Sequence, residues 1–218
     1  MGASGSFPID IVLFGMIAAF LVLRLRSILG KREGFERPIA DPAARPMGEP
    51  PRPVADAPPG PTRALPDPGS ATGQVLADMA RVEPGFHPAR FLDGAEGAFR
   101  LIVTAFAAGD RVGLRPLLAD DTYRAFEGAI SGRETAAETQ RTEIHAINSA
   151  TITAAVLHER HATITVTFVS DQVNLTLGRD GMPVAGTDAV TEITDVWSFE
   201  RELGSADPAW RLAAARSA

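Results

Sequence analysis

The chain of 218 residues contains no cysteine, and Lys31 is its only lysine. Without thiols it can form no disulfide, zinc–thiolate site or cysteine nucleophile, and this absence does not identify a compartment. Arginine and alanine are abundant instead, a bias typical of proteins from GC-rich bacterial genomes. The net charge of −6 argues against nucleic-acid binding as the main task, because such surfaces are rich in positive charge.

An apolar run near the N-terminus is the first informative segment. Residues 11–23 carry no charge, and counted from Phe7 the run reaches the lower limit of about 17 residues for a membrane-spanning helix. A cleaved signal peptide is an alternative, but its basic residues should precede the run. A surface-lying amphipathic helix is another, but this run is apolar on all sides. We therefore predict an uncleaved single-pass anchor within residues 1–30, formed by Ile11, Val12, Leu13, Phe14, Ile17, Phe20, Leu21 and Leu23.

Basic residues follow this run and none precedes it. By the positive-inside rule the N-terminus lies outside and the rest of the chain lies in the cytoplasm, at the cell inner membrane. The basic side chains after the run are positioned to contact anionic lipid headgroups. The residues that we assign to this contact are Arg24, Arg26, Lys31 and Arg32.

Residues 31–84 are rich in proline and poor in apolar side chains, as in EPPRPVADAPPGP. Such a composition cannot bury a core and predicts a disordered linker, with a short helix as an option at residues 75–80. A docking site for a proline-reading partner is the alternative. The folded domain is then expected at residues 85–218.

The domain should be organised around a helix at residues 91–110. Phe99, Ile102 and Phe106 recur at helical spacing and form an apolar face without an acid, a base or a nucleophile. Asp93 is expected to cap the helix, with Glu96 as its capping-box partner, and Gly109 to end it. The face should be covered by the C-terminal third of the chain.

The remaining pattern places helices before strands, which is the α+β order. Asp110 can cap a short turn through Leu114, and the Asp120–Asp121 pair suits the start of a second helix with Tyr123 and Phe126. From Ile144 the apolar period changes to two, and all connections are short, which predicts a mostly antiparallel sheet. The expected strands are residues 149–157, 162–172 with a continuation or new strand at 173–177, 193–201 and 210–215.

Four blocks of sequence resemble one known family, the bacterial relatives of the mitochondrial import inner-membrane translocase subunit 44. They are RLRSILGKREGFERP after the anchor, FLDGAEGAFRLIVTAFAAGDRVGLRPLLADDTYRAFEGAI, HATITVTFVSDQV and TDVWSFERELGSADPAWRL. Ala209 departs from the polar residue expected there. The resemblance implies N-terminal helices packed on a curved sheet, a cystatin-like or nuclear-transport-factor-two-like cone with an apolar pocket. We assign to its core or pocket Phe99, Ile102, Phe106, Phe126, Phe168, Asp195, Trp197 and Phe199.

The family also suggests a function. Its mitochondrial member recruits a heat-shock chaperone to the import channel and contacts cardiolipin. This chain lacks that member's long charged N-terminal region and a mitochondrial transit peptide, so only the adaptor role carries over. We expect a membrane-tethered adaptor or scaffold in protein translocation or membrane-protein quality control. Its partners would be a chaperone or translocation component and membrane lipid, with no nucleic acid, metal, cofactor or enzymatic activity.

Two other functions stay open. A small-molecule- or lipid-binding cone domain, with catalysis as an option, would use Asp195 and Tyr123, because a buried carboxylate can act as a general base. A purely structural interaction module is the other. His158 and His161 form an H-x-x-H pair, but no third ligand is near in sequence, so we expect them to be solvated turn residues.

Overall fold

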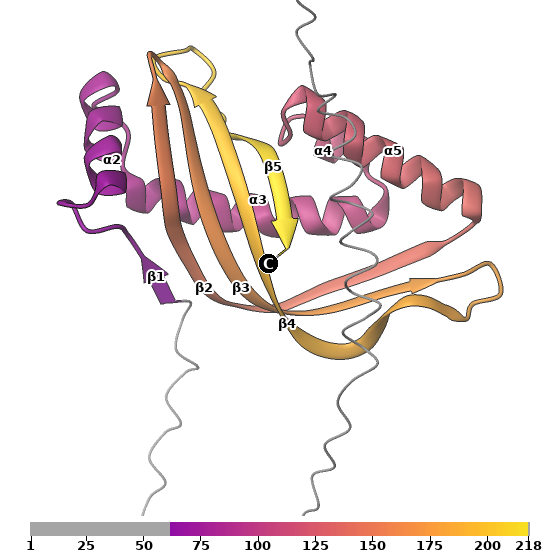
Figure 1. Cartoon of the computed structure of the whole chain (residues 1–218). Helices are drawn as coiled ribbons and strands as arrows, with labels where there is room; N and C mark the ends of the chain where they lie inside the picture. Colours follow the sequence, from indigo (N-terminus) through magenta and orange to yellow (C-terminus); the bar gives the residue numbers. More distant parts are fainter. Residues whose placement is uncertain (1–61, 218) are drawn as a thin grey trace, which may run out of the picture. The chain divides into compact units, whose positions relative to one another are not determined.

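A five-stranded sheet is built mainly from the C-terminal half of the chain, where the sequence shows the period-two alternation. The computed structural model describes residues 62–217, and its sheet runs in chain order (Figure 1). β2 to β5 pair antiparallel, and only the short β1 is parallel to its neighbour β2. The expected α+β fold with a mostly antiparallel, curved sheet is therefore confirmed. The strands are β1 (Thr62–Ala64), β2 (Thr139–His158), β3 (His161–Leu177), β4 (Pro183–Glu202) and β5 (Arg211–Ser217).

Two strands, β2 and β4, extend well beyond the predicted bounds, whereas β3 covers the residues predicted for it, 162–177. β5 pairs only with residues 195–200 of β4, so the opposite half of the sheet consists of β2, β3 and β4 alone. We call this three-stranded half the arm: residues 139–147, 170–177 and 183–193. Register shifts at Ile144/Ala146 and Gln172/Asn174 lie in the arm, and such bulges bend a strand. The sequence pattern missed the β2 and β4 parts of this half, because these segments carry few large apolar side chains, whereas the β3 part was predicted.

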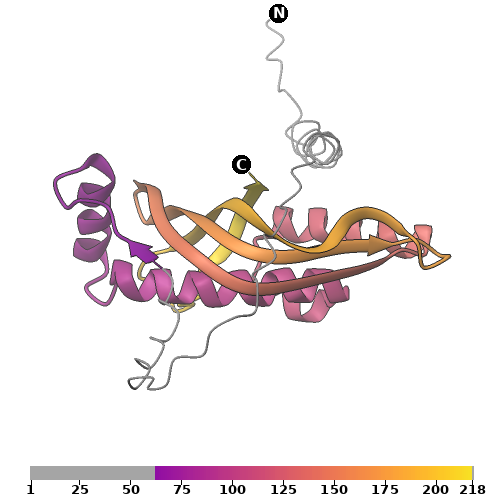
Figure 2. The ribbon, with the colours of Figure 1, turned by 90° about the horizontal axis from the view of Figure 1, so that it is seen from below.

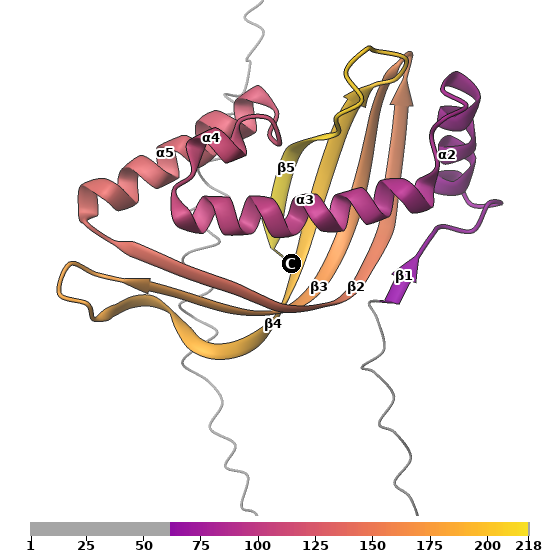
Figure 3. The ribbon, with the colours of Figure 1, turned by 180° about the vertical axis from the view of Figure 1, so that it is seen from behind.

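In the described part of the chain four helices accompany the sheet, and one of them lies across its concave face. They are α2 (Ala71–Val82), α3 (Pro88–Ala108), α4 (Arg111–Leu114) and α5 (Asp120–Ala136). Figures 2 and 3 show α3 crossing the curved strands, with α2 beside β1 at one end and α4 and α5 at the other. The predicted central helix therefore carries the core, and the sheet covers it as expected.

The core lies between α3 and the concave side of the sheet. Phe99 of α3 stacks on Phe168 with ring centroids 4.5 Å apart and contacts Trp197 at 4.7 Å. Phe99, Ile102 and Phe168 are completely buried. Burial of each large apolar side chain contributes about 1.5–3 kcal/mol, so this cluster supplies much of the driving force for folding.

The predicted start of α3 was wrong. The helix begins at Pro88, three residues before the expected position, and a proline in the first turn needs no hydrogen-bonded N–H. Asp93 and Glu96 therefore lie inside the helix, where both pair with Arg63 of β1. The predicted end was right: Gly109 adopts a φ of 70°, and the Asp110 N–H donates to the Ala105 carbonyl at 2.8 Å.

The linker prediction was wrong over its C-terminal part, because β1 and α2 lie between residues 62 and 82. Leu76 and Met79 of α2 are buried against the core, and the Ser70 hydroxyl caps the helix by accepting from the Gly73 N–H at 3.0 Å. Gly73 has to be small, since a Cβ there would lie 2.1 Å from the Asp67 carbonyl oxygen. The optional short helix at residues 75–80 is therefore present, and α2 is longer at both ends than that option.

Several local predictions are confirmed. Asp110 caps α4 by accepting from the Gly113 N–H at 2.9 Å, and Asp120 and Asp121 lie in the first turn of α5. β2 ends at His158 and β3 begins at His161, as expected for the hairpin turn. The predicted anchor and the four headgroup residues lie outside the described residues. Within residues 62–217, no helix combines the length and apolarity needed to cross a membrane.

Candidate functional site

Most of the residues assigned to a core or pocket lie in a filled core. Phe99, Ile102, Phe168 and Phe199 are at most 1% exposed, and Trp197 is 5% exposed. Phe106 and Phe126 form a separate, half-buried pair with ring centroids 4.8 Å apart. The Arg133 guanidinium lies 4.5 Å above the Phe106 ring and donates to the Phe106 carbonyl at 2.5 Å. Burial of Arg133 lowers the pKa of its guanidinium.

Asp195 lies in a row of polar side chains on the inward face, where the sheet body meets the arm. Its carboxylate accepts from the Ser217 hydroxyl at 2.7 Å and from the Gln172 amide at 3.4 Å. Gln172 and Ser170 are almost completely buried, and the Gln172 amide also donates to the Ser170 hydroxyl. The row continues along the arm to Asn174, which donates to Gln172 at 3.1 Å. Asp195 is thus half-buried within a hydrogen-bonded network.

An apolar groove of about 360 Å³ lies along the N-terminal half of α3, and we call it the α3 groove. Its helical wall combines small residues with Arg90, Phe91 and Leu101, and the Leu101 side chain is 61% exposed. Aromatic rings close one side: Phe91 lies 4.8 Å from Trp210 and 6.0 Å from Phe199, centroid to centroid. Of the eight residues that the sequence analysis assigned to the core or pocket, Phe199 is the one that lines this groove. The described lining is Arg90, Phe91, Gly94, Ala95, Gly97, Ala98, Leu101, Leu117, Phe199 and Trp210.

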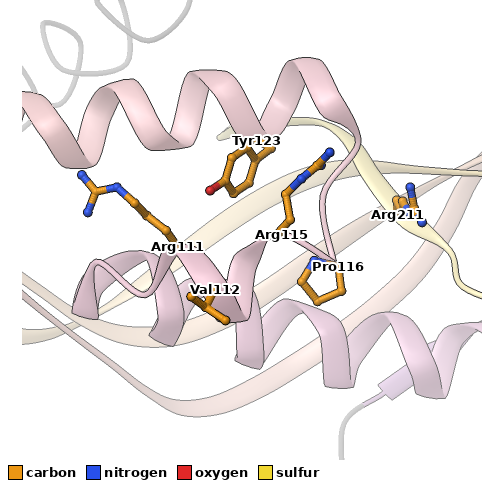
Figure 4. Close-up of a pocket in the computed structure, with 6 residues that line it drawn as sticks. All are labelled: Arg111, Val112, Arg115, Pro116, Tyr123 and Arg211. Atoms are coloured by element: carbon orange, nitrogen blue, oxygen red, sulfur yellow. The ribbon is translucent and has the colours of Figure 1, made fainter.

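A second, more polar pocket of about 630 Å³ lies between α4, the start of α5 and β5; we call it the arginine pocket. Figure 4 shows the Tyr123 ring between Arg111 and Arg115, with Arg211 farther along the same row. The Arg115 guanidinium lies 4.9 Å over the Tyr123 ring, within the range of a cation–π contact. The described lining is Arg111, Val112, Arg115, Pro116, Tyr123 and Arg211.

Carboxylates bind each arginine of this pocket. Arg111 makes a bidentate pair with Glu134, with both N–O distances at 2.8 Å. This pair lowers the pKa of the Glu134 carboxyl and raises the pKa of the Arg111 guanidinium. Arg115 donates to Asp120 at 2.7 Å, which lowers the pKa of the Asp120 carboxyl, and Arg211 donates to Asp207 at 2.9 Å.

The groove and the arginine pocket share one wall. Leu117 and Trp210 line the groove, while their chain neighbours Pro116 and Arg211 line the pocket. Backbone hydrogen bonds fix this wall: the Leu212 N–H donates to the Leu117 carbonyl at 2.8 Å, and the Ala119 N–H donates to the Leu212 carbonyl at 2.9 Å. The two sites therefore lie next to each other, and these backbone hydrogen bonds hold the wall between them in place.

The residues considered for catalysis or metal binding do not form one site. Tyr123 lines the arginine pocket, and Asp195 is not among the described residues that line it. The His161 imidazole lies 3.5 Å from the Glu200 carboxylate. Within residues 62–217, no three His, Cys, Asp or Glu side chains are grouped so that they could hold a metal ion.

Comparison with known proteins identifies the domain. The family model of the Tim44-like domain matches residues 72–217, which is more than half of the chain. The chain belongs to the Tim44-like domain family. The expected resemblance is thereby confirmed, and the Tim44-like domain extends back to include α2.

Solved structures give more distant matches to this Tim44-like chain. The intermembrane-space region of the chloroplast protein ARC6 matches with a TM-score of 0.44 and 8% identity, over 58% of this chain and 95% of that one. A conserved protein from Planctomyces limnophilus DSM 3776 matches with a TM-score of 0.36 and 18% identity, over 60% and 95%. No curated protein matches the sequence.

The sequence interpretation missed both concave sites of the Tim44-like domain. Gly94, Gly97 and Leu101 are spaced on one helical face, but the sequence does not show that this face is left uncovered. Arg211 lies far from Arg111 and Arg115 in the chain. They come together because β5 forms backbone hydrogen bonds with residues 117–119, just before α5. The spacing G-A-E-G-A within the helix was the one available signal for the groove.

Proposed function

We propose that this chain is an adaptor, held at the cell inner membrane by its N-terminal apolar segment, that binds a protein partner through the α3 groove. The partner would be a chaperone or a translocation component, acting in protein translocation or membrane-protein quality control. The Tim44-like domain supports a role associated with translocation. The domain would face the cytoplasm, and the basic residues that follow the apolar segment would contact lipid headgroups.

Two glycines of α3 carry the assignment of the groove. A Cβ added at Gly94 or at Gly97 would meet no atom within 4 Å, so packing does not require glycine at either position. Glycine inside a helix is about 0.8–1.0 kcal/mol less favourable than alanine. The fold therefore gains nothing from these glycines, whereas the groove stays open because both residues lack side chains. An apolar, open groove beside the exposed Leu101 is suited to an apolar segment of a partner.

Binding is also favoured over catalysis by the surroundings of the polar residues. Asp195 is bound by Ser217 and Gln172 within the sheet, and Tyr123 is stacked under Arg115 at the arginine pocket. A general base and a proton donor have to meet at one substrate. The groove itself is lined almost entirely by apolar side chains, which supply contact area but no proton transfer.

The test compares two leucine substitutions in the full-length protein. Gly97→Leu fills the groove, and Gly128→Leu on α5 is the matched control, because a Cβ at Gly128 also meets nothing within 4 Å. Proteins would be crosslinked in membranes, captured with each variant and identified by mass spectrometry. We expect a chaperone or translocation component to be captured by the native protein and by Gly128→Leu, and to be lost with Gly97→Leu.

Equal capture by all three proteins would refute the groove as the partner site. If Gly97→Leu instead abolished co-purification of lipid and left protein partners unchanged, the groove would be a lipid-binding site, as the alternative cone-domain function requires.

A further inference from the structure

The arginine pocket presents a row of cations around the single tyrosine of the chain. Tyr123 lies in the middle of the pocket, with Arg111 on one side and Arg115 and Arg211 on the other (Figure 4). Pro116 and the exposed Val112 add apolar surface to the same wall. The pocket thus combines guanidinium groups with apolar and aromatic contact area.

The three arginines are not equally available for a ligand. Arg111 is held by both carboxylate oxygens of Glu134 and also donates to the Ser131 hydroxyl at 3.1 Å, so it is part of the pocket wall. Arg115 and Arg211 each contact one carboxylate oxygen, and all four side chains of these two pairs are about half exposed or more. Exposed pairs of this kind are weak and can be exchanged for a ligand's carboxylate.

The pocket already binds a carboxylate of its own chain. Asp120 accepts from Arg115, and the charges of Arg124 and Arg211 act on it as well. The N–H groups of a guanidinium form a planar fork that matches carboxylate oxygens. An incoming carboxylate would therefore meet donors of the right geometry.

From this arrangement we propose that the arginine pocket binds an acidic peptide segment of a protein partner, with Arg115 and Arg211 as the groups that take its carboxylates. The guanidinium groups are spread along the row instead of converging on one point, so successive carboxylates of an extended chain fit better than one small anion (Figure 4). Each of these arginines is paired with a carboxylate of Glu134, Asp120 or Asp207, so a carboxylate of the incoming segment has to exchange with one of the exposed pairs.

The position of the pocket beside the α3 groove indicates that the partner's segment also carries apolar residues. Because the pocket shares the wall formed by Pro116, Leu117, Trp210 and Arg211 with the α3 groove, one segment can occupy both sites. Its apolar residues would enter the groove and its acidic residues would reach Arg115 and Arg211. This inference rests on the proposed adaptor function and specifies the chemistry of the partner.

The single tyrosine makes a direct test possible. Full-length protein with ¹³C-labelled tyrosine, in micelles of a non-ionic detergent, should show one set of tyrosine ring signals. Titration with an octaglutamate peptide is expected to shift these signals, and the apparent Kd should rise at high salt, because salt screens exposed charges. The double variant Arg115→Glu, Arg211→Glu should weaken binding by about tenfold or more.

Arg81→Glu, an exposed charge reversal on α2, is the control and should leave the titration unchanged. Absence of a shift with octaglutamate, or a shift that the double variant retains, would overturn the proposal. Equally strong shifts from citrate or inorganic phosphate would assign the pocket to small anions, and shifts from phosphatidylglycerol vesicles would assign it to a lipid surface; both outcomes also overturn it. The adaptor function has its own test in the groove variants, so the two can fail separately.

Discussion

At the scale of single residues, Phe99 joins the helix layer to the sheet. It is completely buried, and its ring contacts both Phe168 and Trp197. We predict that Phe99→Ala lowers the free energy of unfolding by about 3–5 kcal/mol, because the truncation removes buried area and leaves a cavity. Urea denaturation followed by circular dichroism measures this loss.

Phe106→Ala is the matched comparison, because Phe106 lies on the same helix but is only half-buried against Phe126. Its loss of stability should be clearly smaller than that of Phe99→Ala. Equal losses would show that the core is not centred on Phe99.

A second residue-scale prediction concerns acid sensitivity at Glu134. Arg111 lowers the pKa of this carboxyl from its ordinary value of 4.5. A lowered folded-state pKa means that the ion pair stabilises the fold fully above the unfolded pKa, and that this contribution is lost as the pH falls through the folded pKa. The stability difference between the native protein and Glu134→Gln should therefore shrink as the pH is lowered through the acidic range below 4.5.

Urea midpoints measured across this pH range test the prediction. Glu159→Gln, at the exposed turn between β2 and β3, is the control and should show no such trend. A stability difference for Glu134→Gln that is independent of pH would contradict the assigned ion pair.

At the scale of elements, β1 is attached to the domain by backbone pairing with β2 and by the ion pairs of one arginine. Its three residues pair with residues 149–151 of β2, and the Arg63 guanidinium contacts Asp93 at 2.9 Å and Glu96 at 2.7 Å. We predict that Arg63→Ala increases hydrogen exchange in β1, since Glu96, only 7% exposed, loses its cationic partner. Hydrogen–deuterium exchange with mass spectrometry measures this, with Arg81→Ala as the exposed control.

Unchanged exchange in β1 would mean that its backbone pairing with β2 is sufficient. The attachment of β1 would then not depend on the ion pair.

The elements that the sequence predicted well share a strong apolar period. The face with Phe99 and Ile102 and the alternation Ile164, Val166 and Phe168 both appear as expected. In the arm, the β3 part was predicted, but residues 139–147 of β2 and 183–193 of β4 were missed because they carry few large apolar side chains. Only the middle of α2 was predicted, as an optional short helix at residues 75–80, because its buried Leu76 and Met79 are too few to outweigh the surrounding prolines and glycines.

The candidate sites were less accessible to sequence reasoning than the elements. A groove depends on which face of a helix stays uncovered, and this is decided by tertiary packing. Gly94 and Gly97 therefore looked like ordinary helix residues. The arginine pocket depends on β5 returning to the start of α5, a contact between segments about one hundred residues apart. The assignment of Asp195 to an inward position was sound, but its partners Gln172 and Ser217 lay outside the pattern.

At the scale of the whole molecule, the two neighbouring sites would together form the proposed binding surface, which has mixed chemistry. The α3 groove offers apolar area, and the arginine pocket offers charge-assisted hydrogen bonds beside it. Apolar burial contributes most of the affinity of such surfaces, while charged contacts contribute more to specificity and association rate. A tether to the membrane would raise the local concentration of this surface near membrane-bound partners.

The membrane tether leads to the last prediction. If residues 11–23 span the membrane once, deletion of residues 1–30 should release the protein into the soluble fraction, because the apolar segment and its first basic flank are removed together. Deletion of residues 31–60 removes an equal length of chain and keeps the apolar segment, so this control protein should sediment with membranes. Carbonate extraction and immunoblotting distinguish the two. Persistence of the first deletion variant in the membrane fraction would refute the anchor and shift membrane attachment to the domain, where the exposed Leu101 of the α3 groove would be the first residue to test.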